Sequence, residues 1–249
     1  HVFYQRADCC LLYGERARGL MFESGFYQKG QLQVIYNSLD VNSMNRCREA
    51  MTPESRVRVR EKLFSDSSLP IVVAVGRVTR AKRFDLLLPA LALLQGKIEF
   101  NCLIIGDGSQ LESIKEDAST FSLESNICFY GSAYGDEVDE LMLASDLCVI
   151  PGDVGLSAMH AMSAGLPVIS HDAFERQMPE HEAIEEGKTG SFYAYQSVED
   201  LAGKIKWWLS DPERLLLARS HCFEQIDGRF NSTYQVKKIC EALESLGND

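Results

Sequence analysis

From about residue 69 onward, short apolar runs alternate with longer amphipathic stretches. Each run is rich in β-branched side chains and is closed by Gly, Pro or Asp, as is typical of parallel strands covered on both faces. The predicted strands are 71–75, 102–105, 127–130, 147–150 and 167–170. The predicted helices between them are 84–94, 110–121, 137–144 and 156–164. This alternation predicts an α/β fold with a doubly wound parallel sheet, which is a Rossmann-like architecture.

The two ends of the chain have different patterns. The first forty residues contain one strand–helix–strand unit, residues 41–68 are polar with one predicted helix at 53–63, and only helical patterns follow Val198. We therefore predict four segments. They are a remnant of an N-terminal domain with a crossing segment (1–40), a linker with a helix (41–68), a nucleotide-sugar-binding Rossmann-like domain (69–230) and a C-terminal helix (231–249).

Charge and composition exclude some functions. The formal net charge of −11, from 36 acidic and 25 basic side chains, argues against binding to nucleic acid. No apolar run is long enough to cross a bilayer, so we expect a cytoplasmic protein with at most peripheral contact to the inner face of a membrane. The Trp207–Trp208 pair fits either such a contact or, as is commoner for paired aromatics, a core or domain interface.

The eight cysteines do not form a recognisable disulfide or zinc pattern. Cys102, Cys128 and Cys148 lie inside apolar runs, where cysteine acts as a small hydrophobic residue. We therefore expect free thiols in a reducing compartment and no bound metal.

Candidate chemistry gathers where the predicted strands end, since open parallel sheets bind ligands outside the carboxyl ends of their strands. After the first strand, Gly76 and Arg77 open a segment with four cations in residues 77–83, one of which is Lys82. Such a positive segment on an acidic protein fits a phosphate group. The alternative is a solvated loop at the start of a helix.

The ends of the next two strands give weaker signals. Gly106 begins a Gly-Asp-Gly turn before a helix, and Gly131 and Ser132 close the third run. Each offers backbone that a ligand can approach, but each is also an ordinary turn sequence.

The end of the fourth strand is the most informative. Gly155, Leu156 and Ser157 begin a predicted helix whose first amides would point into the cleft and bind a phosphate. His160 follows about one turn later, near the cleft. A single histidine on a helix is more often structural than functional, so both roles stay open.

In these segments the chain resembles the family 4 retaining glycosyltransferases, which share the two-domain GT-B fold. The resemblance covers residues 7–243, with the family's motifs in the family's order. Residues 34–40 (VIYNSLD) resemble the segment that crosses between the domains, and residues 76–85 (GRVTRAKRFD) resemble the "GR…K" signature. Residues 103–108 (LIIGDG), 129–131 (FYG), 161–169 (AMSAGLPVI) and 186–190 (EGKTG) match further family motifs.

The resemblance implies a function. A glycosyltransferase of this kind moves a hexose, with retention of configuration and without a metal or other cofactor, from a UDP- or GDP-type sugar to a glycan or lipid-linked acceptor. Arg77 and Lys82 would hold the diphosphate and stabilise the departing nucleotide, residues 155–157 would cradle the pyrophosphate, and Gly131 and Ser132 would contact the base. The acceptor would bind through an N-terminal domain that is missing here, so we expect this fragment alone to bind nucleotide but transfer little sugar.

The chain departs from the family pattern at two places. The family's paired glutamates align with Gly152 and His160. Asp153, one position away, would replace the contact to the donor sugar, and His160 would bond a ribose hydroxyl. Residues 171–182 replace a short glycine-rich turn. They are predicted either to shape the sugar pocket, with Glu180 or Glu182 as a hydroxyl acceptor, or to form a solvated acidic loop.

Two other functions remain open. A nucleotide-sugar epimerase of the same fold would need acid–base groups around the sugar, which His160, His171 and Glu182 would supply. A non-catalytic nucleotide-sugar-binding module would fit the loss of the paired glutamates. A nicotinamide dehydrogenase fits least, since no GxGxxG follows the first strand.

Overall fold

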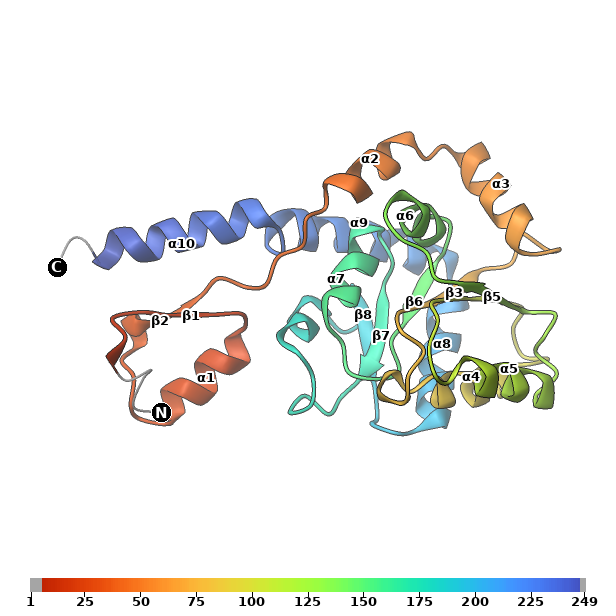
Figure 1. The fold of residues 1–249 in the computed structure, drawn as a ribbon, viewed down its shortest axis with the longest axis horizontal. Helices are drawn as coiled ribbons and strands as arrows, with labels where there is room; N and C mark the ends of the chain where they lie inside the picture. Colours follow the sequence, from red (N-terminus) through yellow and green to blue (C-terminus); the bar gives the residue numbers. More distant parts are fainter. Residues whose placement is uncertain (1–5, 247–249) are drawn as a thin grey trace.

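The structure is a computed structural model that describes residues 6–246, apart from the side chain of Lys29 (Figure 1). Its main body is a six-stranded parallel sheet with the order β5-β4-β3-β6-β7-β8. Numbered from its first strand, this is the 3-2-1-4-5-6 order of the doubly wound nucleotide-binding folds. The predicted fold class is confirmed. The strands are β3 (Ile71–Val75), β4 (Asn101–Ile105), β5 (Ile127–Gly131), β6 (Leu147–Val149), β7 (Val168–His171) and β8 (Gly190–Tyr193).

Helices cover both faces of this sheet. One face carries α4 (Phe84–Ala92), α5 (Leu111–Thr120) and α8 (Val198–Leu209), and the other carries α6 (Asp136–Leu143), α7 (Leu156–Ser163) and α9 (Pro212–Gly228) (Figure 1). Successive residues of a strand point to opposite faces. Accordingly, Val72 and Ala74 belong to the first core, whereas Ile71 and Val73 belong to the second. Each face of the sheet packs against an apolar core, which explains why the sequences of these strands are continuous apolar runs.

Two elements were not predicted. Helix α2 (Asn42–Ala50) lies in the segment expected to hold only α3 (Pro53–Leu63), and β8 joins the edge of the sheet. Helix α2 buries only Met44, and no capping side chain among the described residues marks its start, so the sequence lacked the cap signal that α3 has. Strand β8 has the sequence Gly-Ser-Phe-Tyr, without the β-branched residues that marked the others.

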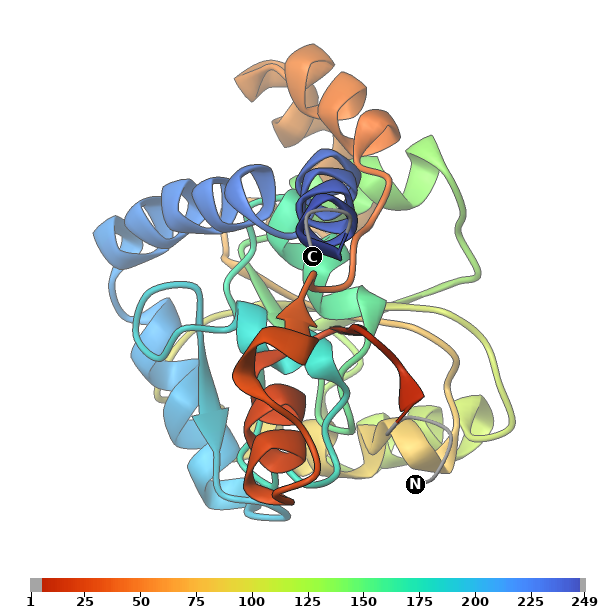
Figure 2. The same cartoon turned by 90° about the vertical axis from the view of Figure 1, so that its left-hand side faces the viewer.

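The N-terminal unit consists of β1 (Cys10–Leu12), α1 (Glu15–Glu23) and β2 (Leu32–Val34), with the two strands paired in parallel. It lies with α10 (Ser232–Leu246) at one end of the molecule (Figures 1 and 2). The crossing segment packs on the start of α10, where Ser38 Oγ donates to Gln235 Oε1 at 2.8 Å. The outermost predicted residues, 1–5 and 247–249, lie outside the described residues.

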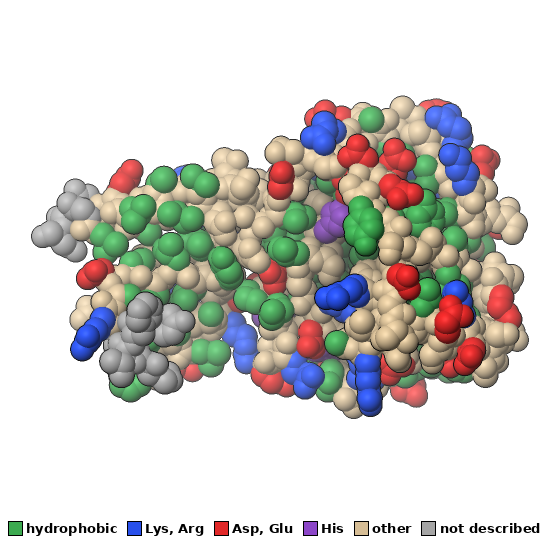
Figure 3. All heavy atoms as spheres, in the orientation of Figure 1, with side chains coloured by type: hydrophobic (Ala, Val, Ile, Leu, Met, Phe, Trp, Pro, Cys, Tyr) green, Lys and Arg blue, Asp and Glu red, His purple; other side chains and the backbone are tan. Residues whose placement is uncertain are grey.

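Hydrophobic side chains gather on the surface of this end of the molecule (Figure 3). The exposed ones on the N-terminal unit and on α10 are Leu11, Tyr13, Leu20, Phe22, Phe26, Val236, Leu243 and Leu246.

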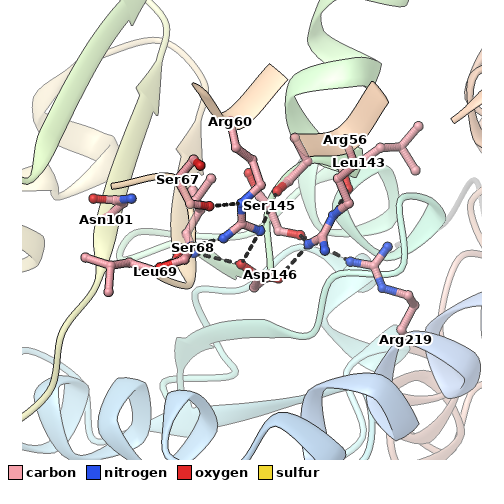
Figure 4. Close-up of polar contacts among 12 residues, drawn as sticks. Arg56, Arg60, Ser67, Ser68, Leu69, Asn101, Leu143, Ser145, Asp146 and Arg219 are labelled. Atoms are coloured by element: carbon pink, nitrogen blue, oxygen red, sulfur yellow. Dashed lines mark hydrogen bonds and ion pairs between the residues drawn. The ribbon is translucent and has the colours of Figure 1, made fainter. Parts of the chain in front are cut away.

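The segment expected to be a linker is docked on the main body. Arg56 and Arg60 on α3 both pair with Asp146, which precedes β6, at 2.6 Å and 3.1 Å (Figure 4). The Asp146 carboxylate also accepts the backbone amide of Ile71 at 2.8 Å. One carboxylate thus joins α3 to the first residue of β3.

The paired tryptophans have separate environments. Trp208 is fully buried, and its indole N–H donates to Ser191 Oγ at 3.1 Å. Trp207 is partly exposed, and the guanidinium of Arg214 lies 3.6 Å from its ring centroid. Among residues 6–246, no helix is both long and apolar enough to span a membrane. All eight cysteines fall within this range, and none is in a disulfide.

Candidate functional site

The candidate site lies where the strand order reverses, between β3 and β6, which is where open α/β sheets form their crevice. The loops that follow these strands touch each other. A Cβ added to Gly152 would lie 2.3 Å from the carbonyl oxygen of Ala81, and Lys82 Nζ donates to the Asp153 carbonyl at 3.2 Å. The structure therefore brings together the predicted cationic segment and the predicted helix start, which are about seventy residues apart in the sequence.

The cations of this segment are not equivalent. The guanidinium of Arg77 is exposed and has no hydrogen bond or ion pair with the part of the chain that the structure describes. Lys82 is partly buried, and its ammonium has only the one carbonyl as partner within that part. Arg83 instead pairs with Asp85 through bonds of 3.0 Å, so its charge is balanced locally. Arg77 and Lys82 thus keep charge available for an anion.

The glycines at the ends of β3 and β4 allow the loops to pack closely. Gly106 has φ of 141°, and a Cβ there would lie 1.9 Å from the carbonyl oxygen of Gly76. Their amides are already used, because Gly76 N donates to Ile105 O at 2.9 Å and Gly106 N donates to Gly131 O at 2.7 Å. These glycines therefore shape the cleft floor, while Ser132 beyond them is exposed.

The start of α7 offers free donors. Its N-cap, Gly155, is extended, and no side chain within residues 6–246 caps the helix. The amides of Leu156 and Ser157 therefore lack the acceptor that a capping side chain would supply. Together with the positive end of the helix dipole, they favour a negative group.

His160 lines a pocket of about 300 Å³ with Leu39 and Ser157. Its Nε2 lies 2.6 Å from Oδ1 of Asp139, a carboxylate that is only 5% exposed. The other Asp139 oxygen accepts from Ser43 Oγ at 2.8 Å. The histidine is thus oriented by a buried acid and also faces the pocket. Sequence reasoning missed Asp139, because only the fold brings these two helices together.

One group of metal-ligand side chains occurs among the described residues. Ligand atoms of Cys47, Asp136 and Asp139 lie within 4.8 Å of one another. The spacing of these residues gave no sign of it. Ser43 Oγ lies 2.6 Å from an oxygen of Asp136 and 2.8 Å from an oxygen of Asp139, and its one proton is donated to this pair of carboxylates, while Asp139 also contacts His160. Both carboxylates therefore have partners within the protein, and Asp139 has one on each of its oxygens.

Asp153 has a histidine partner that sequence reasoning also missed. Its Oδ1 lies 3.0 Å from Nε2 of His171, the last residue of β7, and 3.9 Å from Nε of Arg176. The Asp153 side chain is 42% exposed, whereas that of His171 is fully buried. No sequence signal links the two residues, because the contact depends on β6 and β7 being neighbours in the sheet.

The two glutamates of residues 171–182 contact the first forty residues of the chain. Glu182 accepts the amides of Glu15 and Arg16, at 2.7 Å and 2.8 Å, at the start of α1. Glu180 is 5% exposed and accepts from Asn37 Nδ2 at 2.5 Å. Glu182 thus holds the N-terminal unit, and Glu180 holds the crossing segment, against the main body. The prediction of a solvated acidic loop is therefore wrong for the buried Glu180, whereas Glu182 is half-buried, and the hydroxyl-acceptor role stays a prediction.

Comparison with known proteins agrees with this geometry. The family model "Glycosyl transferases group 1" matches residues 55–220. Sulfoquinovosyl transferase SQD2 of Arabidopsis thaliana is 30% identical over 216 residues, which are 84% of this chain and 39% of that protein. A GDP-mannose-dependent alpha-(1-6)-phosphatidylinositol monomannoside mannosyltransferase of Mycolicibacterium smegmatis is 24% identical over 78% of this chain and 51% of its own length. The chain thus spans about half or less of these relatives.

Solved structures share the fold. Anabaena HepE in complex with UDP superposes with a TM-score of 0.77 at 20% identity, over 96% of this chain and 64% of that one. A glycosyltransferase from Rickettsia africae superposes with a TM-score of 0.80 at 19% identity, over 100% and 67% of the two chains. The chain thus shares the fold of these two proteins. Because the family model covers well over half of the sequence, the chain belongs to the glycosyl transferases group 1 family.

Proposed function

We propose that this chain binds a nucleotide-diphospho-sugar of the UDP or GDP type and serves as the donor half of a retaining hexosyltransferase. The observation that carries the proposal is the meeting of Lys82 with the uncapped start of α7 at the switch point of the sheet. A cation and free amides at that point suit a diphosphate. Anabaena HepE, of similar fold, is described in complex with UDP-glucose, which supports this donor class.

The proposed mechanism relies on charge stabilisation. As the bond between sugar and diphosphate breaks, negative charge develops on the departing phosphate. Arg77, Lys82 and the amides of residues 156–157 would stabilise it without reorganising, which is how preorganised donors lower a barrier. We propose that these groups act without a metal ion. The nucleoside would extend toward Ser132 and His160.

The acceptor is proposed to be a glycan or a lipid-linked sugar. The printed names of two relatives support this class, since one is a sulfoquinovosyl transferase and another acts on a phosphatidylinositol monomannoside. Acceptor contacts would come from an N-terminal domain beyond the unit seen here. We accordingly propose a cytoplasmic location with peripheral membrane contact, and little transfer by this chain alone.

Calorimetric titration with UDP, GDP and ADP, and with their hexose conjugates, tests the proposal. Charge-assisted contacts contribute roughly 1.5–3 kcal/mol, so Lys82→Ala and Arg77→Ala should each weaken binding by about tenfold or more. Lys97→Ala removes an exposed cation in the connection before β4, at the amino ends of the strands, and should leave the affinity for nucleotide unchanged. Failure of the folded protein to bind any of these nucleotides, or an equal loss in K97A, would refute the proposal. Conversion of the donor to an epimer in the same mixtures would instead identify an epimerase.

A further inference from the structure

A second pocket, of about 310 Å³, lies between the N-terminal unit and the segment that follows β7. We call it the aromatic pocket. Three of its lining residues lie within 171–182, where the chain departs from the family pattern, so the family resemblance does not imply this pocket. The residues that line it are Arg16, Phe174, His181, Glu182, Ile184 and Phe192.

The pocket has an aromatic corner. The centroid of the Phe174 ring lies 4.9 Å from that of Phe192, at an interplanar angle of 82°, and 5.2 Å from that of His181, at 30°. Phe174 and Phe192 are only partly buried, so part of their ring surface is open to a ligand. The face of an aromatic ring is negative, and it attracts the weakly positive C–H bonds on the apolar face of a pyranose.

Two polar groups of the pocket have unused hydrogen-bonding capacity. His181 Nδ1 lies 2.9 Å from the Met178 carbonyl, which only accepts, so the proton of the neutral ring is on Nδ1 and Nε2 is an acceptor. This Nε2 has no partner among the described residues, although His181 is only 8% exposed. The exposed guanidinium of Arg16 also has no hydrogen bond or ion pair within residues 6–246.

These features fit a single sugar ring. Small-molecule sites are mostly apolar, carry a few placed polar groups and enclose about 300–1,000 Å³, and the aromatic pocket lies at the low end of that range. The aromatic corner suits the apolar face of the ring, while His181 Nε2 would accept from one hydroxyl and Arg16 would donate to another.

The position of the pocket separates its occupant from the donor sugar. Gln177 anchors the segment that carries Phe174 beside the proposed donor site, because it accepts the amide of Val154 at 2.7 Å and donates to His171 O at 2.8 Å. Phe174 is three residues from His171, so their Cα atoms are at most about 11 Å apart. The aromatic pocket therefore adjoins the donor site.

The lining residues also differ from those of the donor site. The donor sugar is tied through its diphosphate to Lys82 and the start of α7, and none of these residues lines the aromatic pocket. Arg16, in contrast, belongs to the N-terminal unit, on the side from which the acceptor is proposed to bind. A second sugar, separate from the donor, is thus the occupant that this position favours.

We propose that the aromatic pocket binds a pyranose ring of the acceptor, with Phe174 and Phe192 against its apolar face and with His181 and Arg16 on its hydroxyl groups. This inference rests on the proposed function, and it makes the donor half of the enzyme a contributor to acceptor recognition.

The test uses methyl α-D-glucopyranoside, methyl α-D-galactopyranoside and methyl α-D-mannopyranoside as probes. Saturation-transfer difference NMR measures their dissociation constants on the chain alone, with saturating UDP or GDP, and with saturating UDP-glucose or GDP-mannose. At least one glycoside should bind, and its affinity should stay within about twofold in all of these mixtures, as expected of separate sites. Displacement by the sugar conjugates but not by UDP or GDP would overturn the proposal, because the glycoside would then occupy the donor-sugar site.

Three variants locate the bound glycoside. Phe174→Leu keeps an apolar side chain without a flat face, His181→Phe keeps a ring without the acceptor nitrogen, and Arg16→Ala removes the guanidinium. Each should weaken glycoside binding about fivefold, the size of effect expected for one hydrogen bond or aromatic contact, and should leave nucleotide affinity within about twofold.

Two matched controls should leave glycoside binding unchanged. Tyr134→Leu removes an aromatic ring that is 80% exposed and lies outside the pocket. Arg18→Ala removes a cation of α1 that does not line the pocket. Because Arg16 is exposed, R16A decides if F174L or H181F does not fold.

The outcomes distinguish the two proposals. If the folded chain binds no nucleotide, the proposed function fails, and the assignment of the pocket to an acceptor fails with it. If nucleotides bind but none of the glycosides does, only the role of the aromatic pocket is overturned. The same holds if the losses in F174L and R16A are no larger than those in Y134L and R18A.

Discussion

Replacing Asp146 by asparagine should destabilise the protein strongly, although the residue is far from the cleft. The carboxylate joins three groups: Arg56, Arg60 and the amide of Ile71 (Figure 4). The Arg60 side chain is 8% exposed and that of Asp146 is 17% exposed. The asparagine side chain would keep an acceptor for the amide but would leave the buried Arg60 without a counter-ion.

The magnitude follows from these exposures. Removing one partner of a buried ion pair costs about 3–5 kcal/mol. Arg56 is 32% exposed, so its pair adds at most about 1 kcal/mol. Since the asparagine keeps one bond, we expect a loss at the low end, about 3 kcal/mol, which lowers Tm by roughly 6–12 °C in a chain of this size.

Urea unfolding followed by far-UV circular dichroism measures this loss. The matched control is Asp85→Asn, which removes the carboxylate of an exposed pair with Arg83 and should cost less than about 1 kcal/mol. A double-mutant cycle with Arg60→Gln should give a coupling energy of about 1–3 kcal/mol between positions 60 and 146. A D146N variant no less stable than D85N, or a coupling near zero, would refute the assignment of Asp146 as the residue that docks α3.

Three further predictions concern the N-terminal unit and the thiols. Glu182→Gln weakens the hydrogen bonds that the carboxylate accepts from the first amides of α1. Limited trypsin digestion should therefore cut that helix faster in this variant than in the unchanged protein or in the control Glu175→Gln. Equal rates would argue against a docking role for Glu182. Burial raises the pKa of Cys102 and of Cys148 from 9.0 to about 12, so a thiol reagent at pH 8 should label exposed Cys240 but neither buried thiol until the chain unfolds. The pKa of these two thiols is higher in the folded protein than in the unfolded chain. Their contribution to the free energy of unfolding is therefore complete below about pH 9 and falls as the pH rises toward about 12. A free energy of unfolding that does not change over that range would contradict this.

Some features of the protein follow from local sequence patterns. The strand at 71–75 occurs within the predicted bounds, because its continuous apolar run reflects burial on both faces. The helix at 53–63 also occurs as predicted, although it buries no apolar side chain; its start is marked by the capping residue Thr52 and by Pro53. The α/β class and the position of the site outside the carboxyl ends of the strands follow from the same alternation. Helix α2, which lacks a capping side chain among the described residues, and strand β8, which lacks β-branched residues, were not predicted.

The details of the candidate site depend on tertiary structure. Asp139 and His160 are 21 positions apart, and Asp153 and His171 are 18 positions apart, on elements that only the packed sheet brings together. The use of Glu182 to cap a helix 166 residues away is equally absent from any local pattern. A local pattern reports which side chains one element buries, since it depends on the repeat of that element alone. The partner of a polar side chain is set by the order of the strands and the contact of loops, and these are decided only when the whole chain folds.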